Sequence, residues 1–283
     1  MTEAHGLTMP EDARLAELMA AMARRREPHA LATVVETRGS TSAHPGDRAL
    51  IDAAGTVLLG WVGGGCAEGA VRRAALDGLG DGRPRMIDLD LDDEVLGVGM
   101  PCGGTMRVFV APILPPATLW IVGHGRVAES LCRIGVELGF RVVVSDVPAP
   151  EPDRFPGADE IIGDDYDFAR LQPARDDSVV IATQHKGDHL SAVRALRSPA
   201  GHVAIIASRK RAALMRDFLR DEGFGPAALT RLRAPAGLDL GARSPAEIAL
   251  SVLAEIVMRR RGGTGTPRDA GLVEPSALAE AAP

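Results

Sequence analysis

The chain has 283 residues, which is ample for two domains because single hydrophobic cores stop growing beyond roughly 250 residues. Its apolar share of 46% and charged share of 25% are those of an ordinary globular protein, and the aromatic share of 3% requires a core built mainly from aliphatic side chains. The formal net charge of −6, without a long basic run, argues against a nucleic-acid groove.

Cysteine content and hydropathy point to the compartment of the protein. Three cysteines in a chain of this length do not make a disulfide framework. No charged-then-apolar leader opens the sequence, and no apolar run reaches the roughly 18 residues that would span a bilayer. We therefore expect a cytoplasmic protein with reduced cysteines and no membrane span.

The first part of the chain, over 8–114, is predicted to form an α+β domain. Apolar residues recur at helical spacing from Leu15 to Met22, which predicts an amphipathic helix over 11–25. Ala54-Gly55 is typical of a hairpin turn. The further expected elements are strands over 30–36, 48–51 and 56–62, a helix over 66–79, and strands over 85–89 and 106–112, followed by a linker at Pro112, Pro115 and Pro116.

The second part, over 118–261, alternates strands and helices and predicts a Rossmann-like parallel sheet with helices on both faces. Ser244-Pro245-Ala246-Glu247 is a capping box that starts a helix to Arg260. Residues 262–283 are rich in Gly, Pro and Ala and are expected to be a disordered tail. The expected elements are strands over 118–122, 141–145, 178–183 and 202–207, and a helix over 127–138. The predicted fold class is α/β.

A glycine motif lies between the first strand and the first helix of the second part. Gly123, Gly125 and Ala128 form a G-x-G-x-x-A, whose glycines permit a tight turn and the close approach of a diphosphate to the helix N-terminus. Asp146 ends the next strand, where an acid commonly holds a ribose hydroxyl. Glycines at such a turn also serve tight packing alone, so NAD(P) or another nucleotide is one of two interpretations of this motif.

Two Cys-Gly arrangements stand in the first part. Gly63, Gly64 and Gly65 can form an anion nest, and Cys66 at a helix N-terminus would have its thiolate stabilised by the helix dipole. Glu68, one turn on, is either a proton acceptor or a favourable N-terminal charge. The second arrangement is Cys102, Gly103 and Gly104, before a strand. Cys66 and Cys102 are candidate soft metal ligands; the alternative for both is a glycine turn beside a small buried thiol.

Two further groups carry weaker signals. His185 and His189 follow a strand of the parallel sheet and can ligate a metal if both lie on one helical turn, or can cap the helix or face solvent. Cys132, on the first helix of the second part, is expected to be an ordinary core residue.

Taken in order, these motifs resemble the XdhC/CoxI family of accessory proteins for molybdenum hydroxylases such as xanthine dehydrogenase and carbon monoxide dehydrogenase. The resemblance runs from about Leu31 to Arg261. It rests on the segments 38–41, 45–48, 64–68, 102–104, 207–211, 234–241 and 244–249. Ala207 departs from the family's glycine, and alanine tolerates fewer backbone conformations.

The resemblance implies a maturation chaperone and not a turnover enzyme. Such a protein binds and protects the molybdenum cofactor, in its molybdopterin or cytosine dinucleotide form, promotes its sulfuration and delivers it to an apo-hydroxylase client. A cysteine desulfurase is an expected partner and a homodimer the expected assembly. Cys66 and Cys102 would carry the site, with Glu68 and the neighbouring glycines shaping it.

Two alternatives remain open. One is an NAD(P)-dependent oxidoreductase that uses the Rossmann-like domain, for which His185 is the one candidate proton donor. The other is a sulfur-transfer enzyme that forms a persulfide on Cys66 or Cys102.

Overall fold

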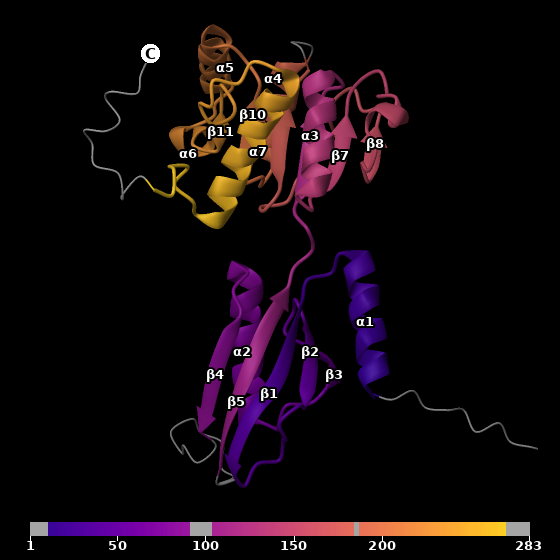
Figure 1. Cartoon of the computed structure of the whole chain (residues 1–283), viewed down its shortest axis with the longest axis vertical. Coiled ribbons are helices and arrows are strands. Elements are labelled where there is room, and N and C mark those ends of the chain that lie inside the picture. Colours follow the sequence, from indigo (N-terminus) through magenta and orange to yellow (C-terminus); the bar gives the residue numbers. More distant parts are fainter. Residues whose placement is uncertain (1–10, 91–103, 184–186, 270–283) are drawn as a thin grey trace, which may run out of the picture. The chain divides into compact units, whose positions relative to one another are not determined.

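The computed structural model describes residues 11–90, 104–183 and 187–269, and the chain divides into two compact units, Met1–Pro115 and Pro116–Pro283 (Figure 1). No helix within the described ranges is long and apolar enough to cross a membrane. The first unit contains an antiparallel sheet and the second a parallel one. The predicted α/β fold class, an α+β domain followed by a Rossmann-like domain, is confirmed.

The first unit is built on a five-stranded sheet in the order β3-β2-β1-β5-β4, with every neighbouring pair antiparallel. Two helices accompany it. Its elements are α1 (Glu11–Arg25), β1 (His29–Gly39), β2 (Arg48–Asp52), β3 (Val57–Gly60), α2 (Cys66–Asp81), β4 (Arg85–Asp90) and β5 (Gly104–Ile113).

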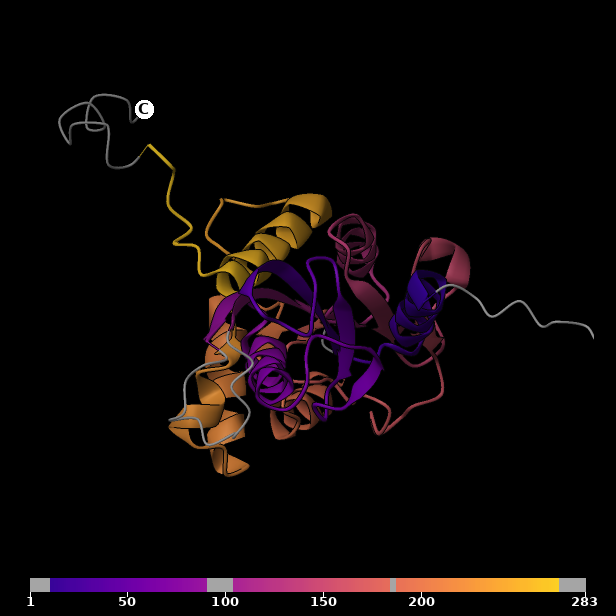
Figure 2. The same ribbon diagram turned by 90° about the horizontal axis from the view of Figure 1, so that it is seen from below.

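Strand alternation divides this unit into two cores, because successive side chains of a strand point to opposite faces. On one face Ala30, Ala32 and Val34 of β1 pack in the same cluster as the apolar side of α2. On the other face Leu50 of β2 packs against Leu15 of α1. The two helices therefore cover opposite faces of the sheet (Figure 2).

The predicted elements of this unit are confirmed, with most ends shifted by one to three residues. β1 extends beyond the predicted 30–36 because β5 pairs with it as far as Gly39↔Gly104, across an irregularity between Val34 and Glu36. β3 is shorter than the predicted 56–62. It ends at Gly60, whose φ is +82° and where a Cβ would stand 2.1 Å from the carbonyl oxygen of Arg48. The chain turns there as only glycine allows.

The second unit is built on a six-stranded parallel sheet in the order β11-β10-β9-β6-β7-β8. The order reverses at the β6–β9 pair, as in dinucleotide-binding folds. Its elements are β6 (Thr118–Val122), α3 (Arg126–Glu137), β7 (Arg141–Ser145), the short 3-10 helix η2 (Pro152–Arg154), β8 (Glu160–Ile162), β9 (Ser178–Ile181), α4 (Asp188–Arg197), β10 (His202–Ile205), α5 (Arg209–Asp221), α6 (Pro226–Leu229), β11 (Leu232–Arg233) and α7 (Pro245–Arg261).

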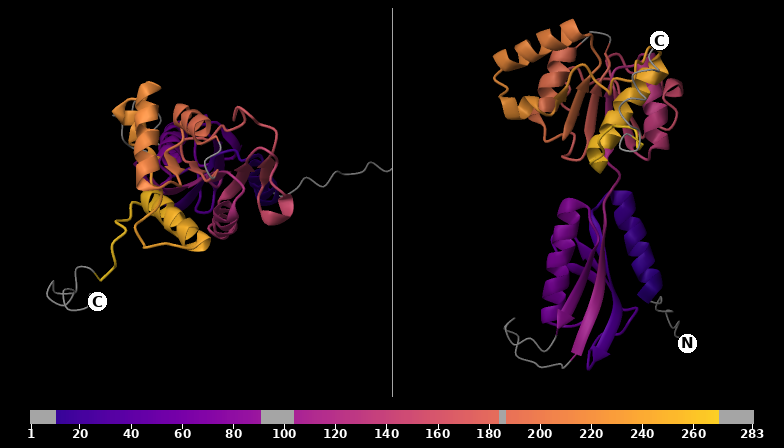
Figure 3. Two further views of the ribbon diagram at one scale, coloured as in Figure 1. Left: turned by 90° about the horizontal axis from the view of Figure 1, so that it is seen from above. Right: turned by 60° about the vertical axis from the view of Figure 1, so that its left-hand side comes forward.

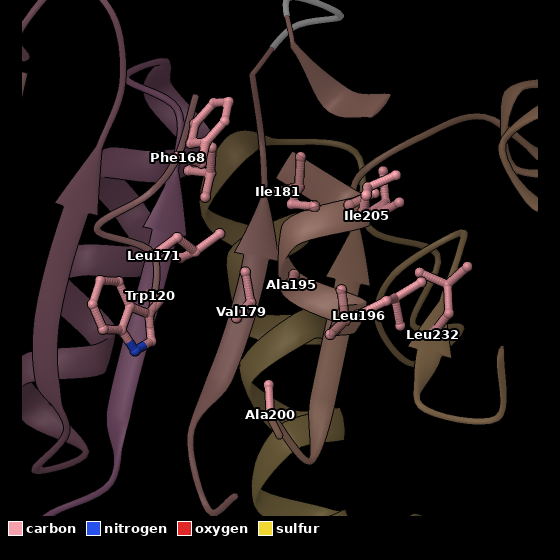
Figure 4. Close-up of a cluster of buried hydrophobic side chains, with 14 of the residues drawn as sticks. Trp120, Phe168, Leu171, Val179, Ile181, Ala195, Leu196, Ala200, Ile205 and Leu232 are labelled. Carbon is pink, nitrogen blue, oxygen red and sulfur yellow. The ribbon is translucent and has the colours of Figure 1, made fainter. Parts of the chain in front are cut away.

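Helices cover both faces of the parallel sheet, as the alternating pattern predicts. α3 and α7 pack together on one face, where Leu131 and Leu253 join Ile121 in one cluster (Figure 3). α4 and α5 cover the other face, where Leu196 and Leu219 belong to the cluster drawn in part in Figure 4. Strands buried on both sides explain why the runs of this unit are continuously apolar.

Some features of this unit matched the prediction and others were missed. β6 and β7 have the predicted bounds, and the capping box at α7 is present, with the Ser244 hydroxyl accepting from the backbone N–H of Glu247. The edge strands β8 and β11 were not predicted, since they have three and two residues. α7 ends before Gly262, and most of the expected tail, from residue 270 on, lies outside the described residues.

Candidate functional site

The glycine run of the first unit turns the chain into α2. Gly63 has φ +104° and Gly65 has φ +54°, and Gly65 is the N-cap residue of α2 with no side-chain hydrogen bond to the helix. No heavy atom of the described residues would contact a Cβ built at Gly64. The turn therefore leaves space beside the first amides of a helix, where an anion is electrostatically favoured.

Cys66 is the first residue of α2, so the predicted helix N-terminal position is confirmed, while its side chain is not among those described. Glu68 lies on the first turn. Its carboxylate stands 3.8 Å from the guanidinium of Arg72 one turn later, and both side chains are close to half exposed. An exposed pair of this kind contributes little to stability, and Glu68 remains accessible from solvent.

The second Cys-Gly motif meets the end of β1. A Cβ at Gly104 would lie 2.7 Å from the carbonyl oxygens of both Arg38 and Ser40, so only glycine permits this approach. Gly104, the described end of the second motif, thus meets the segment 38–41 of the family resemblance at one point of the sheet. Cys102 and Gly103 themselves lie outside the described residues.

The glycine run before α2 packs against the same strand. A Cβ at Gly63 would stand 3.5 Å from the side-chain methyl carbon of Met106, two residues after Gly104 on β5. Ala67 of α2 and Met106 belong to one buried cluster. The described parts of the two Cys-Gly motifs therefore come to one end of the first unit, while joint ligation by Cys66 and Cys102 stays a prediction.

In the second unit the first glycine turn is tightly packed between strand ends. Gly123 follows β6 with φ +130°, and a Cβ there would stand 2.4 Å from the carbonyl oxygen of Ala182, just beyond β9. Gly125 is the N-cap of α3 in an extended conformation and supplies no side-chain cap. Gly123 is thus required by the close approach of backbone, which is the packing interpretation of the motif.

Asp146, the acid expected to hold a ribose hydroxyl, is hydrogen-bonded within the protein, and its role toward a ribose stays a prediction. Asp146 follows β7, and one of its carboxylate oxygens lies 2.5 Å from the Nδ1 of His124, which donates to it. The other oxygen accepts from the backbone N–H of Val147. The side chain of His124 is 45% exposed. A ribose that bound to Asp146 would have to displace this solvent-accessible imidazole from the carboxylate.

A buried polar network after β9 was missed by the sequence analysis. The carboxylate of Asp188, which is 2% exposed, accepts from the Thr183 hydroxyl and from the Arg211 guanidinium at 2.8 and 3.1 Å. A buried carboxylate needs such a partner. The sequence signal was an acid at the start of one helix and an arginine-rich start of the next, 23 residues later.

The predictions for the two histidines and for Cys132 differ in how far the structure tests them. His185 lies outside the described residues, and the ring of His189 makes an edge-to-face contact with Phe218 at 4.6 Å. The metal hypothesis for this pair stays a prediction. Cys132 is fully buried in the core beside α7, as expected, and its burial raises the pKa of the thiol to about 11. Within the described ranges no three His, Cys, Asp or Glu side chains gather into a metal-binding cluster.

Comparison with known proteins places the chain in a family. Residues 22–90 match the model of the XdhC and CoxI family, and residues 119–256 match the XdhC Rossmann domain, so the two matches together cover well over half of the chain. The chain belongs to the XdhC and CoxI family. The resemblance stated from the motifs is thereby confirmed.

The relatives of this XdhC-family chain include three bacterial proteins. It is 30% identical to the uncharacterized protein YqeB of Escherichia coli over 84% of this chain, and 29% identical over 56% of this chain to a Bacillus subtilis protein described as a probable xanthine dehydrogenase subunit. It is 25% identical to the molybdenum cofactor insertion chaperone PaoD of Escherichia coli over 81% of this chain and 83% of PaoD.

The alignments span 44% of YqeB and 47% of the Bacillus subtilis protein, so this chain corresponds to less than half of these two relatives. A crystal structure described as a xanthine dehydrogenase from Bacillus halodurans aligns over 91% of this chain and 99% of that chain, with 23% identity and a TM-score of 0.45.

Proposed function

We propose that this protein is a maturation chaperone that binds the molybdenum cofactor and inserts it into an apo molybdenum hydroxylase. The observation that carries the proposal is the match of both units to one family. A molybdenum cofactor insertion chaperone, PaoD, is also among the relatives of this chain. The alignment with PaoD covers most of this chain and most of PaoD, which favours a shared role over a single shared domain.

The residues of the first unit fit such a ligand. The cofactor is an anion that carries a soft metal, and when bound it supplies the dithiolene-held molybdenum on which hydroxylases depend. Gly63, Gly64 and Gly65 offer a turn with open space and a helix N-terminus without a side-chain cap, which suit an anionic group. Cys66 and Cys102 offer the thiolates that a soft metal prefers. Glu68, which solvent reaches, would hold or accept a proton at the rim.

The proposal also covers what the chaperone does with the cofactor, which client receives it, and where and in what assembly the protein acts. The chaperone protects the cofactor from oxygen, promotes its sulfuration together with a cysteine desulfurase, and delivers it to a client of the xanthine dehydrogenase or carbon monoxide dehydrogenase type. The cofactor is bound as molybdopterin or as its cytosine dinucleotide. The protein acts in the cytoplasm as a homodimer, and a cofactor held between protomers would be shielded from solvent.

The test is anaerobic binding of molybdenum cofactor to the full chain and to Cys66→Ser and Cys102→Ser. We expect each substitution to raise the Kd at least about tenfold, because serine keeps the size of cysteine but lacks a soft sulfur ligand. Cys132→Ala is the matched control. It removes a thiol that is buried in the second unit, so the affinity of the folded protein for the cofactor should not change.

Two results would contradict the proposal. One is cofactor affinity that is indifferent to both cysteines, and the other is the absence of any saturable cofactor binding. In a parallel titration with NADH, tight binding without cofactor binding would favour the oxidoreductase. A persulfide trapped on Cys66 or Cys102 after incubation with a sulfur donor, again without cofactor binding, would favour the sulfur-transfer enzyme.

A further inference from the structure

A pocket of about 590 Å³ opens in the second unit where β10 leads into α5. Ile206, Leu214 and Ile248 form its apolar side, and Ser208, Lys210 and Arg211 its polar side. We propose that this pocket binds a phosphorylated nucleoside, with the phosphate on the polar side and the base against the apolar side.

The dimensions and the apolar side suit a nucleoside. Small-molecule pockets usually enclose about 300–1,000 Å³ and combine apolar walls with a few polar groups. The apolar side draws on two elements, because Leu214 lies on α5 and Ile248 on α7. Leu214 is 61% exposed, so a planar base would remove a large apolar surface from water.

The polar side carries a positive charge that the described protein does not balance. The guanidinium of Arg211 is held by the buried Asp188 at 2.8 Å, which fixes its position and offsets its charge. Lys210 lines the same pocket and forms no ion pair with the residues that the structure describes. A lysine ammonium presents three donors to a phosphate, as a compact point charge.

The charge at this turn is not explained by helix stability. The first turn of α5 contains Arg209, Lys210 and Arg211 and no acidic residue, although cations at a helix N-terminus oppose the helix dipole. The side-chain oxygen of Ser208 already accepts from the backbone N–H of Arg211, and its hydroxyl can still donate to a ligand oxygen. A bound phosphate would offset both the lysine charge and the dipole.

The location agrees with the topology of the sheet. Ligands of open parallel sheets bind beyond the carboxyl ends of the strands, near the point where the strand order reverses. β10 neighbours β9, which pairs with β6 at that reversal. At the glycine turn after β6, by contrast, Asp146 is engaged by His124, whereas the cation beside β10 has no partner of opposite charge within the described ranges.

The experiment is calorimetric titration of the full chain with CMP, AMP and inorganic phosphate, each without molybdenum cofactor. We expect saturable binding of the nucleotides, a Kd at least about tenfold higher in Lys210→Ala, and near-normal affinity in Lys210→Arg. Arg209→Ala is the matched control, because Arg209 stands on the same turn but does not line the pocket. It should change the affinity by less than about threefold.

Leu214→Ala separates the two halves of the pocket. It should weaken CMP and AMP while leaving the weaker binding of inorganic phosphate unchanged, because only the nucleotides carry a base. Lys210 and Leu214 are both exposed, so the variants should fold. In a Trp61→Phe background, the fluorescence of Trp120 in the core of this unit reports whether they do.

Several outcomes would overturn the inference. They are the absence of saturable nucleotide binding at millimolar concentration, equal losses in Arg209→Ala and Lys210→Ala, and affinity that responds to Gly123 or His124 but not to Lys210. None of these outcomes bears on the cofactor titrations of Cys66→Ser, so the two proposals succeed or fail separately.

Discussion

His202, the first residue of β10, is buried with neither ring nitrogen bonded to any described residue. Burial, with a smaller contribution from the Arg233 guanidinium, lowers its pKa from 6.5 to about 4. The folded state thus disfavours the protonated imidazole, whereas the unfolded chain binds the proton below pH 6.5. We predict that stability falls as the pH drops from 6.5 towards 4, by up to about 3 kcal/mol from this residue.

The measurement is urea unfolding between pH 7 and pH 4, followed by the fluorescence of Trp120 in a Trp61→Phe background, since these are the two tryptophans of the chain. His202→Leu should remove this part of the pH dependence, leaving that of the carboxylates. His189→Gln, an exposed histidine of the same unit, should keep it. A pH dependence that His202→Leu does not reduce would contradict the assignment.

For single residues, the sequence predicted the place of a residue in a helix or strand better than its hydrogen-bond partner. The N-terminal place of Cys66 on α2 and the burial of Cys132 followed from glycine and apolar patterns. The sequence placed Asp146 correctly after a strand but could not show that His124, 22 residues away, would donate to it. Such contacts depend on how two turns meet at the sheet edge, and local patterns do not contain that information.

Among the helices, α7 carries the most complete start signal. The Ser244 oxygen accepts from the backbone N–H of Glu247, and the Glu247 carboxylate accepts from the backbone N–H groups of Ser244 and Arg243, which lower its pKa. Because α7 buries Val252, Leu253 and Ile256 against the sheet, fraying of its first turn is coupled to the core. We predict that Ser244→Ala destabilises the second unit by about 1 kcal/mol.

The same Trp120 fluorescence in urea measures this loss. Thr264→Ala, at an exposed position beyond α7, is the control and should leave the transition within about 0.5 kcal/mol of the parent. An equal shift in both variants, or none in Ser244→Ala, would show that the capping box does not limit the stability of the helix.

Elements with a strong local pattern were predicted closely, and elements made by tertiary pairing were not. β6 and β7 are continuous apolar runs and were predicted with the bounds that they have. β8 and β11 are strands because Glu160–Ile162 and Leu232–Arg233 lie beside longer strands, and such short stretches carry no periodicity of their own. β1 was extended by pairing in the same way.

For the molecule as a whole, the order of motifs was the most informative signal. Single features such as the glycine turn at Gly123 fitted both packing and binding, whereas several motifs in one order identified the family. The pocket between Ile206 and Ile248 escaped prediction because its walls come from segments about 40 residues apart. Its lining depends on α5 and α7 packing near the same strand end, which no local pattern specifies.

Hydrogen exchange across the chain should follow the strand order of the two sheets. β6 and β9 are paired on both sides, whereas β8 and β11 are short edges paired on one side. We predict amide exchange in β6 and β9 at least roughly a hundredfold slower than in β8 and β11, a difference of about 3 kcal/mol in opening free energy. In the first unit β1 and β5 should likewise exchange more slowly than β3 and β4, which form its edges.

Mass spectrometry of peptides from the full chain provides the measurement, with each unit compared against its own edge strands as the internal control. Protection in β8 or β11 equal to that in β6 would contradict this sheet order, because an edge amide facing solvent can exchange without opening the central ladder.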